Sequence, residues 1–183
     1  MLTSLFLALT LTTQGKGPVV ITEQQLTDFV NQKVKYEQQY GLPGLFEASL
    51  KLDRMNVELG RQGANMANVL GNGNFTLTLP NKPAMDGKIK ANFEAKPRYA
   101  KEEGAIYFDN FELKDYTIEP ASMKQQFAPL MGYLVSSLKQ RLSKEPAYRL
   151  NEKDKDQAWL KAHVTGFEMT PGKLRLITAE KVE

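Results

Sequence analysis

The spacing of apolar residues changes along the chain and separates a helical N-terminal part from an extended middle part. Apolar residues near the N-terminus recur at helical spacing and share one face: Leu26, Phe29, Val30 and Val34. Thr22 followed by Gln25 is a capping-box pattern, which marks a helix start. Residues 41–44 read GLPG, a turn-forming composition. The pattern therefore predicts one helix that begins at Thr22 and continues until shortly before the GLPG turn.

Between residues 44 and 118 apolar and polar residues alternate. This spacing is typical of half-buried antiparallel strands that have one wet face and one dry face. Two such strands are marked by apolar residues of constant parity: Phe75, Leu77 and Leu79 in the first, and Met85, Ile89, Ala91, Phe93 and Ala95 in the second. A turn is expected between them at residues 81–83, which read NKP. The middle of the chain is therefore predicted to form an antiparallel sheet.

Three changes of parity interrupt this alternation in the neighbouring segments. They fall between Leu52 and Met55, between Phe108 and Phe111, and between Leu113 and Tyr116. A plain slip of one residue would turn the core face of a strand to water, so each change predicts a bulge or a bend. Because repeated bulges coil a sheet strongly, we predict a curved sheet that wraps around another element.

A long helix is predicted to fill that concavity. It begins at residues 119–122, which read EPAS. Its apolar residues cover an arc of roughly 140°, wider than a coiled-coil seam. They are Met123, Phe127, Leu130, Met131, Leu134, Val135, Leu138 and Leu142. Pro129 falls on the opposite, polar side, where it removes one backbone hydrogen bond to Gln125 and bends the helix. A helix that is convex toward solvent suits a concave sheet.

The C-terminal part is predicted to contain three short elements. Residues 147–150 form a strand, residues 155–163 form a helix around Trp159 and Leu160, and residues 167–177 form a hairpin that turns at TPGK. The expected fold class is α+β, with a long bent helix wrapped by a highly curved antiparallel β-sheet, an additional N-terminal helix and a short C-terminal helix. We expect a single domain over residues 17–183.

The first residues, MLTSLFLALTLTTQGKG, are expected to lie outside that domain. The apolar run from Leu2 to Leu11 is close to the h-region of a secretory signal and is too short to span a bilayer in the usual way. No Lys or Arg precedes the run, and no A-x-A-like site follows it. We predict an export leader over residues 1–16. An ordinary N-terminal core strand and a misplaced start codon are the alternatives.

Composition and charge exclude several kinds of function. The chain has 183 residues, 42% of them hydrophobic and 25% charged, with a net charge of +3, which is ordinary for a globular protein. The densest basic run, KQRLSK at residues 139–144, ends a helix, where the dipole favours cations, so we interpret it as a solvated face rather than a nucleic-acid surface. The absence of cysteine removes disulfides, thiol nucleophiles and cysteine-ligated metals.

The remaining motifs do not indicate catalysis. His163 is the only histidine and is interpreted as a surface or helix-cap residue, since no second histidine and no G-x-S-x-G motif accompanies it. Residues 71–74, GNGN, precede a strand rather than a helix, so we interpret them as a hairpin or loop turn and not as a phosphate loop. Asp154 and Asp156 lack the glycine and glutamate of a calcium loop. We therefore predict no enzyme activity, no metal and no cofactor.

Several phrases, in this order and at this spacing, resemble a known family. They are VITEQQL at 20–26, GLPG at 41–44, GAIYF at 104–108, APLMGYL at 128–134, EPAYRL at 145–150 and TPGKLRL at 170–176. They resemble the YceB-like family of uncharacterised bacterial envelope lipoproteins over roughly residues 19–177. The resemblance implies a long helix wrapped by a curved antiparallel sheet, similar to the tubular lipid-binding superfamily, and a place in the periplasm or envelope of a Gram-negative bacterium. No cysteine follows the apolar leader, which speaks against a lipid anchor.

Two functions from different classes follow from this interpretation. In the first, a monomer close to a membrane holds a lipid or fatty-acid-like ligand between helix and sheet, without catalysis. The expected lining is Phe127, Leu130, Met131 and Leu134 on the helix, facing Phe75, Leu77, Ile89 and Phe93. In the second, the same residues form a dry core, and the protein is a structural or interaction module of the envelope. Seven methionines and nine phenylalanines suit either an adaptable cavity or a core.

Overall fold

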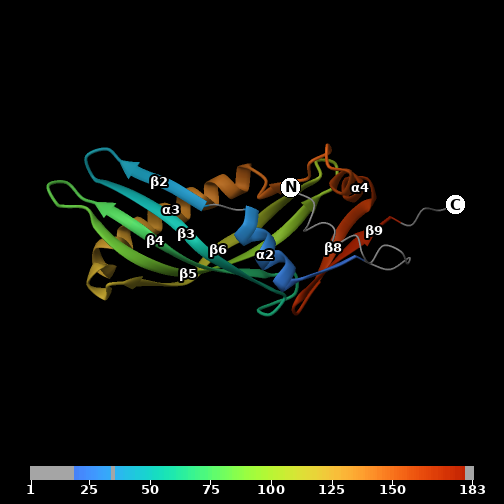
Figure 1. The fold of residues 1–183 in the computed structure, drawn as a ribbon, viewed down its shortest axis with the longest axis horizontal. Helices are drawn as coiled ribbons and strands as arrows, with labels where there is room; N and C mark the ends of the chain where they lie inside the picture. Colours follow the sequence, from blue (N-terminus) through green and yellow to red (C-terminus); the bar gives the residue numbers. More distant parts are fainter. Residues whose placement is uncertain (1–18, 34–35, 180–183) are drawn as a thin grey trace.

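The computed structural model describes residues 19–33 and 36–179, which form two antiparallel sheets and the helices that cover them (Figure 1). The larger sheet has the order β2 (Tyr36–Leu42), β3 (Phe46–Leu59), β4 (Ala67–Thr78), β5 (Met85–Ala100), β6 (Ala105–Glu119) and β7 (Tyr148–Arg149). The smaller sheet has the order β1 (Val20–Thr22), β9 (Lys173–Thr178) and β8 (Val164–Thr170). The helices are α2 (Glu23–Lys33), α3 (Lys124–Lys144) and α4 (Lys155–His163), with one 3₁₀ turn at Ala121–Met123. The predicted α+β class is confirmed. The predicted leader lies outside the described residues.

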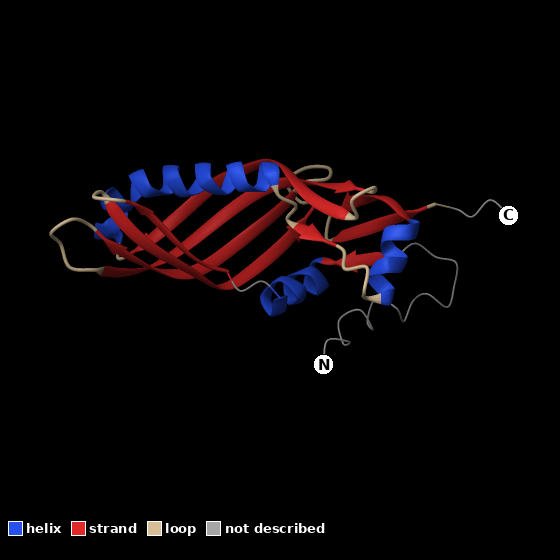
Figure 2. Cartoon of the chain, turned by 90° about the horizontal axis from the view of Figure 1, so that it is seen from above, coloured by secondary structure: helices blue, strands red, loops and turns tan. Residues whose placement is uncertain are grey.

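The larger sheet is curled into a half-barrel, with α3 lying along its concave side (Figure 2). Its bulges lie at the positions where the alternation of apolar residues changes parity in the sequence. On β3 the register passes from Leu52 to Arg54 and leaves Asp53 unpaired, and on β6 it skips Lys114. A third shift leaves Asn110 and its neighbour Phe111 opposite a single residue of β5, and Asn110 has a left-handed φ of 50°. The bulges predicted from parity are therefore confirmed, and they explain the curvature.

The bulge on β3 explains a glycine-rich stretch that the sequence interpretation placed wrongly. Residues 71–74 are not a turn but lie inside β4. Gly73 pairs with Leu52 directly before the bulge, where the two strands approach closely. A β-carbon at position 73 would overlap the backbone oxygen of Lys51 and would lie 3.0 Å from the Cα of Leu52. Gly73 is therefore required by the approach of the bulged strand rather than by a turn.

A hydrophobic core lies between the first half of α3 and the sheet. Phe127 is almost fully buried, and its ring lies 4.3 Å from that of Phe75 on β4. Leu130, Met131 and Leu134 follow at helical spacing and are also buried. Pro129 lies on the exposed side of α3, as predicted. Burial of this face is the main source of stability that the structure shows for α3, because helices of this kind depend on tertiary packing.

A second core lies at the other end of β3 and β4. It is built from Val57, Leu59, Ala67 and Met169, with residues of α2 and the smaller sheet packed around it. Its connection to the smaller sheet is close, since the Gly172 N–H donates to the Leu59 carbonyl at 2.9 Å. Elements from both ends of the chain therefore cover the part of the sheet that α3 does not reach.

Helix α2 covers the edge of β3 beyond Leu52, where the pairing of β3 with β2 stops. Its Thr27 hydroxyl accepts from the Val57 N–H at 2.9 Å, and the Asn31 side chain accepts from the Met55 N–H at 2.8 Å. Glu23 accepts from the Leu59 N–H at 2.7 Å. Four residues of helix advance about as far as two residues of strand, so positions i, i+4 and i+8 meet alternate strand N–H groups. Hydrogen bonds to side chains of α2 thus replace the bonds that a neighbouring strand would make to this part of β3. They protect the edge from pairing with another chain.

The N-terminal helix is shorter than predicted. The capping box is confirmed, since Thr22 N–H donates to the Gln25 amide oxygen at 2.9 Å and the Gln25 N–H donates back to the Thr22 hydroxyl at 3.2 Å. However, α2 ends at Lys33, and the predicted helical position Val34 lies outside the described residues. The described residues that follow form strand β2, which pairs with β3 from Tyr36 to Leu42. The sequence YEQQYGL lacks apolar alternation because β2 is an edge strand. The expected strand, helix and hairpin of the C-terminal part are confirmed.

The Glu23 carboxylate gives the stability of the fold a pH dependence. Its two oxygens accept from Arg61, with Nε at 2.8 Å and Nη2 at 2.8 Å, and this pairing lowers the pKa of Glu23. Because the folded-state pKa lies below the unfolded value, this contribution is complete above the unfolded pKa and is lost as pH falls through the folded pKa.

We expect Glu23→Gln to lower the melting temperature at pH 7 by roughly 2–4 °C, since a charge-assisted pair and a strand cap are weakened. Thermal unfolding followed by circular dichroism between pH 7 and pH 3 measures the effect. The difference in melting temperature between the native protein and Glu23→Gln should disappear at acid pH. Glu102→Gln, an exposed carboxylate in the β5–β6 turn, is the matched control. A difference in melting temperature that stays constant across the pH range would contradict this role of the carboxylate.

Candidate functional site

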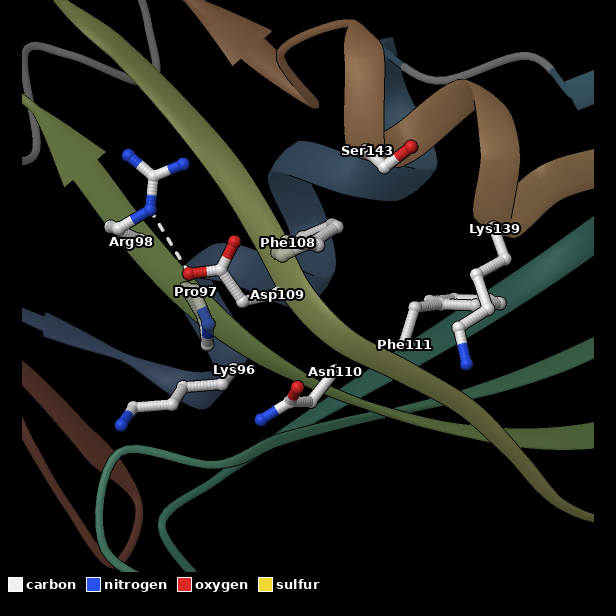
Figure 3. A pocket seen from close by; sticks show the side chains of 9 residues that line it. All are labelled: Lys96, Pro97, Arg98, Phe108, Asp109, Asn110, Phe111, Lys139 and Ser143. Carbon is white, nitrogen blue, oxygen red and sulfur yellow. Dashed lines mark hydrogen bonds and ion pairs between the residues drawn. The ribbon is translucent and has the colours of Figure 1, made fainter.

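A cleft of about 600 Å³ lies between the second half of α3 and neighbouring segments of β5 and β6 (Figure 3). Its lining comes from three elements: Lys96, Pro97 and Arg98 on β5, Phe108, Asp109, Asn110 and Phe111 on β6, and Lys139 and Ser143 on α3. The β6 segment is the one that carries the Asn110 bulge. A bulge re-aims the side chains that follow it, so the irregular strand shapes one wall of the cleft.

The helix wall of the cleft exists because the packing against α3 weakens along its length. On the face toward the sheet, Phe127, Leu130, Met131 and Leu134 are buried, whereas Val135, Leu138 and Leu142 are only half-buried. Lys139 and Ser143, one helical turn apart, line the cleft from this second half. The second half of α3 therefore presents apolar surface that the sheet does not fully cover.

Two aromatic residues of β6 form the apolar part of the strand wall, and this part continues into the core. Phe111 is buried and stacks on Phe93, with ring centroids 5.1 Å apart and planes at 22°. Phe93 in turn packs against the core beneath α3. Stacked aromatic rings form a large rigid apolar surface. Phe108 adds a second ring to the same wall. This arrangement can contact a hydrocarbon chain without a change in the core.

Charged side chains stand around the aromatic wall. The Arg98 Nε donates to the Asp109 carboxylate at 3.0 Å, and the guanidinium lies over the Tyr107 ring at 5.0 Å from its centroid. Within residues 19–33 and 36–179, neither Lys96 nor Lys139 makes an ion pair. The cleft thus combines an apolar wall with cations that are not neutralised.

A smaller hollow of about 190 Å³ adjoins the cleft and shares Lys96, Pro97 and Arg98 with it. Tyr99 lines this hollow, and its hydroxyl oxygen is buried with no hydrogen-bond partner among the described residues. Burial raises the pKa of Tyr99, while the Lys161 charge acts in the opposite direction. A buried donor without a partner is uncommon in a folded protein and leaves a place for an acceptor atom.

The residues predicted to line a ligand cavity are brought together, but they do not line this cleft. The structure gathers them in one cluster: Phe75, Leu77, Ile89, Phe127, Leu130, Met131 and Leu134 are buried, and Phe93 is partly buried against them. Direct packing such as that of Phe75 on Phe127 fills the space between helix and sheet there. Their contact with a ligand stays a prediction.

Sequence interpretation missed the cleft residues. The signal that marks them is the parity slip between Phe108 and Phe111, which indicated a bulge but not the direction in which the bulge turns its side chains. Lys139 was assigned to a solvated helix end; it is exposed, and it also borders the cleft. The sequence interpretation gave no role to Lys96 or Arg98, since nothing in the sequence brings β5 close to the end of α3.

The motifs considered for chemistry have structural roles. The Asp154 carboxylate caps α4 and accepts from the N–H groups of Asp156 and Gln157. His163 lies in the last turn of α4, with Nδ1 2.8 Å from the Trp159 carbonyl oxygen and its ring stacked on Trp159. In the part of the chain that the structure describes, no cluster of His, Asp or Glu could hold a metal ion. No described helix combines the length and hydrophobicity that a membrane span requires.

Comparison with known proteins relates this sequence to a family of unknown function and to uncharacterised lipoproteins. The family model described as "Protein of unknown function (DUF1439)" matches residues 21–173. The chain is 29% identical over 159 residues to "Uncharacterized lipoprotein YceB" of Salmonella typhimurium, which covers 84% of this chain and 83% of the relative. It is 28% identical over 159 residues to the protein of the same name in Escherichia coli K12, with the same coverage. The match thus covers more than four fifths of both the chain and the relatives.

Proposed function

The chain belongs to the DUF1439 family, and from this premise we propose that it is a non-enzymatic protein of the bacterial cell envelope that holds one lipid or other apolar ligand between α3 and the curved sheet. The relatives, which are named lipoproteins, support the proposed envelope location. The sequence contains no cysteine, so attachment through a lipidated cysteine is not part of the proposal.

The cleft between α3, β5 and β6 is the observation that carries this proposal. Its volume of about 600 Å³ falls within the range of about 300–1,000 Å³ that is usual for small-molecule sites. Such sites combine apolar and aromatic walls with a few polar groups. Phe108 and Phe111 provide the aromatic wall here, and the half-buried Leu138 and Leu142 of α3 are the sequence neighbours of the lining residues Lys139 and Ser143. A ligand with a hydrocarbon chain would bury both surfaces.

Native mass spectrometry of the protein, purified from an envelope extract without delipidation, tests the proposal. We expect extra mass that corresponds to one lipid or fatty acid and that is lost on collisional activation. Ser143→Trp places a bulky ring in the cleft and should reduce the lipid-bound fraction by about tenfold. Ser136→Trp, on the same exposed face two helical turns before Ser143 and outside the cleft lining, is the matched control and should bind as the native protein does.

Two results would contradict ligand binding in the cleft. The first is a clean mass of the unmodified chain that persists after incubation with lipid vesicles. The second is an equal lipid-bound fraction in both tryptophan variants, which would place the ligand elsewhere.

An interaction module without a ligand is the second candidate, and the dry core beneath the first half of α3 favours it. Leu77 and Phe127 are almost completely buried there. Strand β2 is the outermost strand of the larger sheet, and no strand of the described residues pairs with its outer side. An open edge is where another chain could add a strand. Under this candidate the purified protein carries no lipid and retains a partner protein.

A further inference from the structure

We infer that the ligand of the cleft is anionic at its polar end, and that the cations on the two sides of the cleft, Lys96 and Arg98 on β5 and Lys139 on α3, favour a phosphate or carboxylate group on it (Figure 3). The inference rests on the proposed function, because it names the chemical class of the ligand proposed for the same cleft. It follows from the charges that line the cleft and from the way in which they are held.

The charge of the cleft is unbalanced. Its lining contains three cations, Lys96, Arg98 and Lys139, against one carboxylate, Asp109. That carboxylate is already engaged, since it accepts from the Arg98 Nε at 3.0 Å. Among the described residues the two lysines make no ion pair. An anion that enters the cleft would therefore meet cations that no protein carboxylate neutralises.

Arg98 is held in one orientation from two sides. Asp109 binds its Nε, and the Tyr107 ring lies beneath its guanidinium at 5.0 Å. Figure 3 shows the two terminal nitrogens directed away from Asp109, and the structure gives them no hydrogen bond within the described residues. The planar fork of a guanidinium matches a phosphate or a carboxylate bidentately, and a fork that is already oriented loses less freedom on binding.

The three cations come from two walls of the cleft, with the aromatic wall beside them. Lys96 and Arg98 are on β5, Lys139 is on α3, and Phe108 and Phe111 belong to β6. Lysine side chains can lie along apolar surface while the ammonium group stays in water. An anionic amphiphile matches both parts of this lining. A neutral acyl compound would make no ionic interaction with the cations. An anion without an acyl chain would make no apolar contact with the aromatic rings.

Binding of four defined probes to the full chain, each kept below its critical micelle concentration where it has one, tests the inference. The probes are lysophosphatidylglycerol, which is anionic, lysophosphatidylcholine, which is zwitterionic, a monoacylglycerol with the same acyl chain, and inorganic phosphate. Isothermal titration calorimetry should show that lysophosphatidylglycerol binds about tenfold more tightly than the other two acyl probes, with the advantage reduced in high salt. Phosphate alone should bind much more weakly.

The double variant Lys96→Gln/Lys139→Gln removes two cations that make no ion pair and should leave the fold intact. We expect it to bind lysophosphatidylglycerol roughly 10- to 30-fold more weakly and to bind the monoacylglycerol unchanged. The matched control is Lys88→Gln/Lys90→Gln, two exposed lysines on the same strand outside the cleft, which should bind as the native chain does.

The remaining outcomes separate failure of this inference from failure of the proposed function. Equal affinity for the three acyl probes would overturn the anionic headgroup and leave lipid binding standing. Equal losses in the two double variants would overturn the role of the cleft cations. Phosphate that binds as tightly as the lysophospholipid would show an anion site without an acyl chain. Failure of all four probes to bind would overturn the proposed function itself.

Discussion

Replacement of Leu134 by aspartate is expected to leave the chain without a stable fold. Leu134 is 7% exposed and belongs to the same cluster as Phe127 and Leu130. A carboxylate buried without a partner costs several kcal/mol, and proteins of this size are stable by only about 5–15 kcal/mol. Circular dichroism and urea denaturation measure the result. Ser136→Asp, on the exposed side of α3, should unfold at nearly the native midpoint.

The Leu134→Asp result also bears on where a ligand lies. If the variant folds with a native midpoint but no longer takes up lipid, the space beneath the first half of α3 is an open tunnel rather than a core. That outcome would move the ligand from the cleft toward the residues predicted from the sequence. Loss of the fold agrees with a dry core there and with a ligand confined to the second half of α3.

Replacement of Gly73 by alanine is expected to be nearly as damaging, although it adds one methyl group. A β-carbon at this position would overlap the backbone oxygen of Lys51, which belongs to a paired strand and cannot rotate away. Relief of the overlap requires the bulge on β3 to move, so we expect a loss of about 2–4 kcal/mol. Urea denaturation with an unchanged m-value checks this.

Gly132→Ala is the matched control for Gly73→Ala. Gly132 lies on the exposed side of α3, and a β-carbon there would meet no atom within 4 Å. An interior helical glycine replaced by alanine should raise stability by about 0.5–1 kcal/mol. If the two substitutions have similar effects, the close approach of β3 and β4 does not constrain position 73.

Much of the fold could be predicted from the sequence because buried positions recur at regular intervals along a strand or helix and are occupied by apolar residues. Leu52 and Met55 have opposite parity and face the same side only if one residue between them is unpaired, and Asp53 is that residue. The face of α3 that contains Phe127 could be predicted for the same reason. Strand β2 could not be predicted, since an edge strand that buries few side chains does not need alternating apolar and polar residues.

The candidate site could not be predicted from periodicity. Arg98 and Lys139 are 41 positions apart in the sequence and line one cleft only because the coiled sheet carries β5 toward the end of α3. The bulge at Asn110 was indicated by parity, but the side to which it turns Phe111 depends on backbone geometry. The predicted lining residues are the ones with the strongest apolar periodicity, and this property selects a core more readily than a cavity.

The most direct test of the central claim, that a ligand lies between the second half of α3 and strands β5 and β6, is photo-crosslinking with a palmitic acid that carries a diazirine. After irradiation and proteolysis, mass spectrometry locates the modified peptides. The account predicts adducts in residues 108–111 and 139–143, and their loss in Ser143→Trp. Adducts confined to other surfaces, such as the exposed turn that contains Leu42 and Leu45, would contradict it.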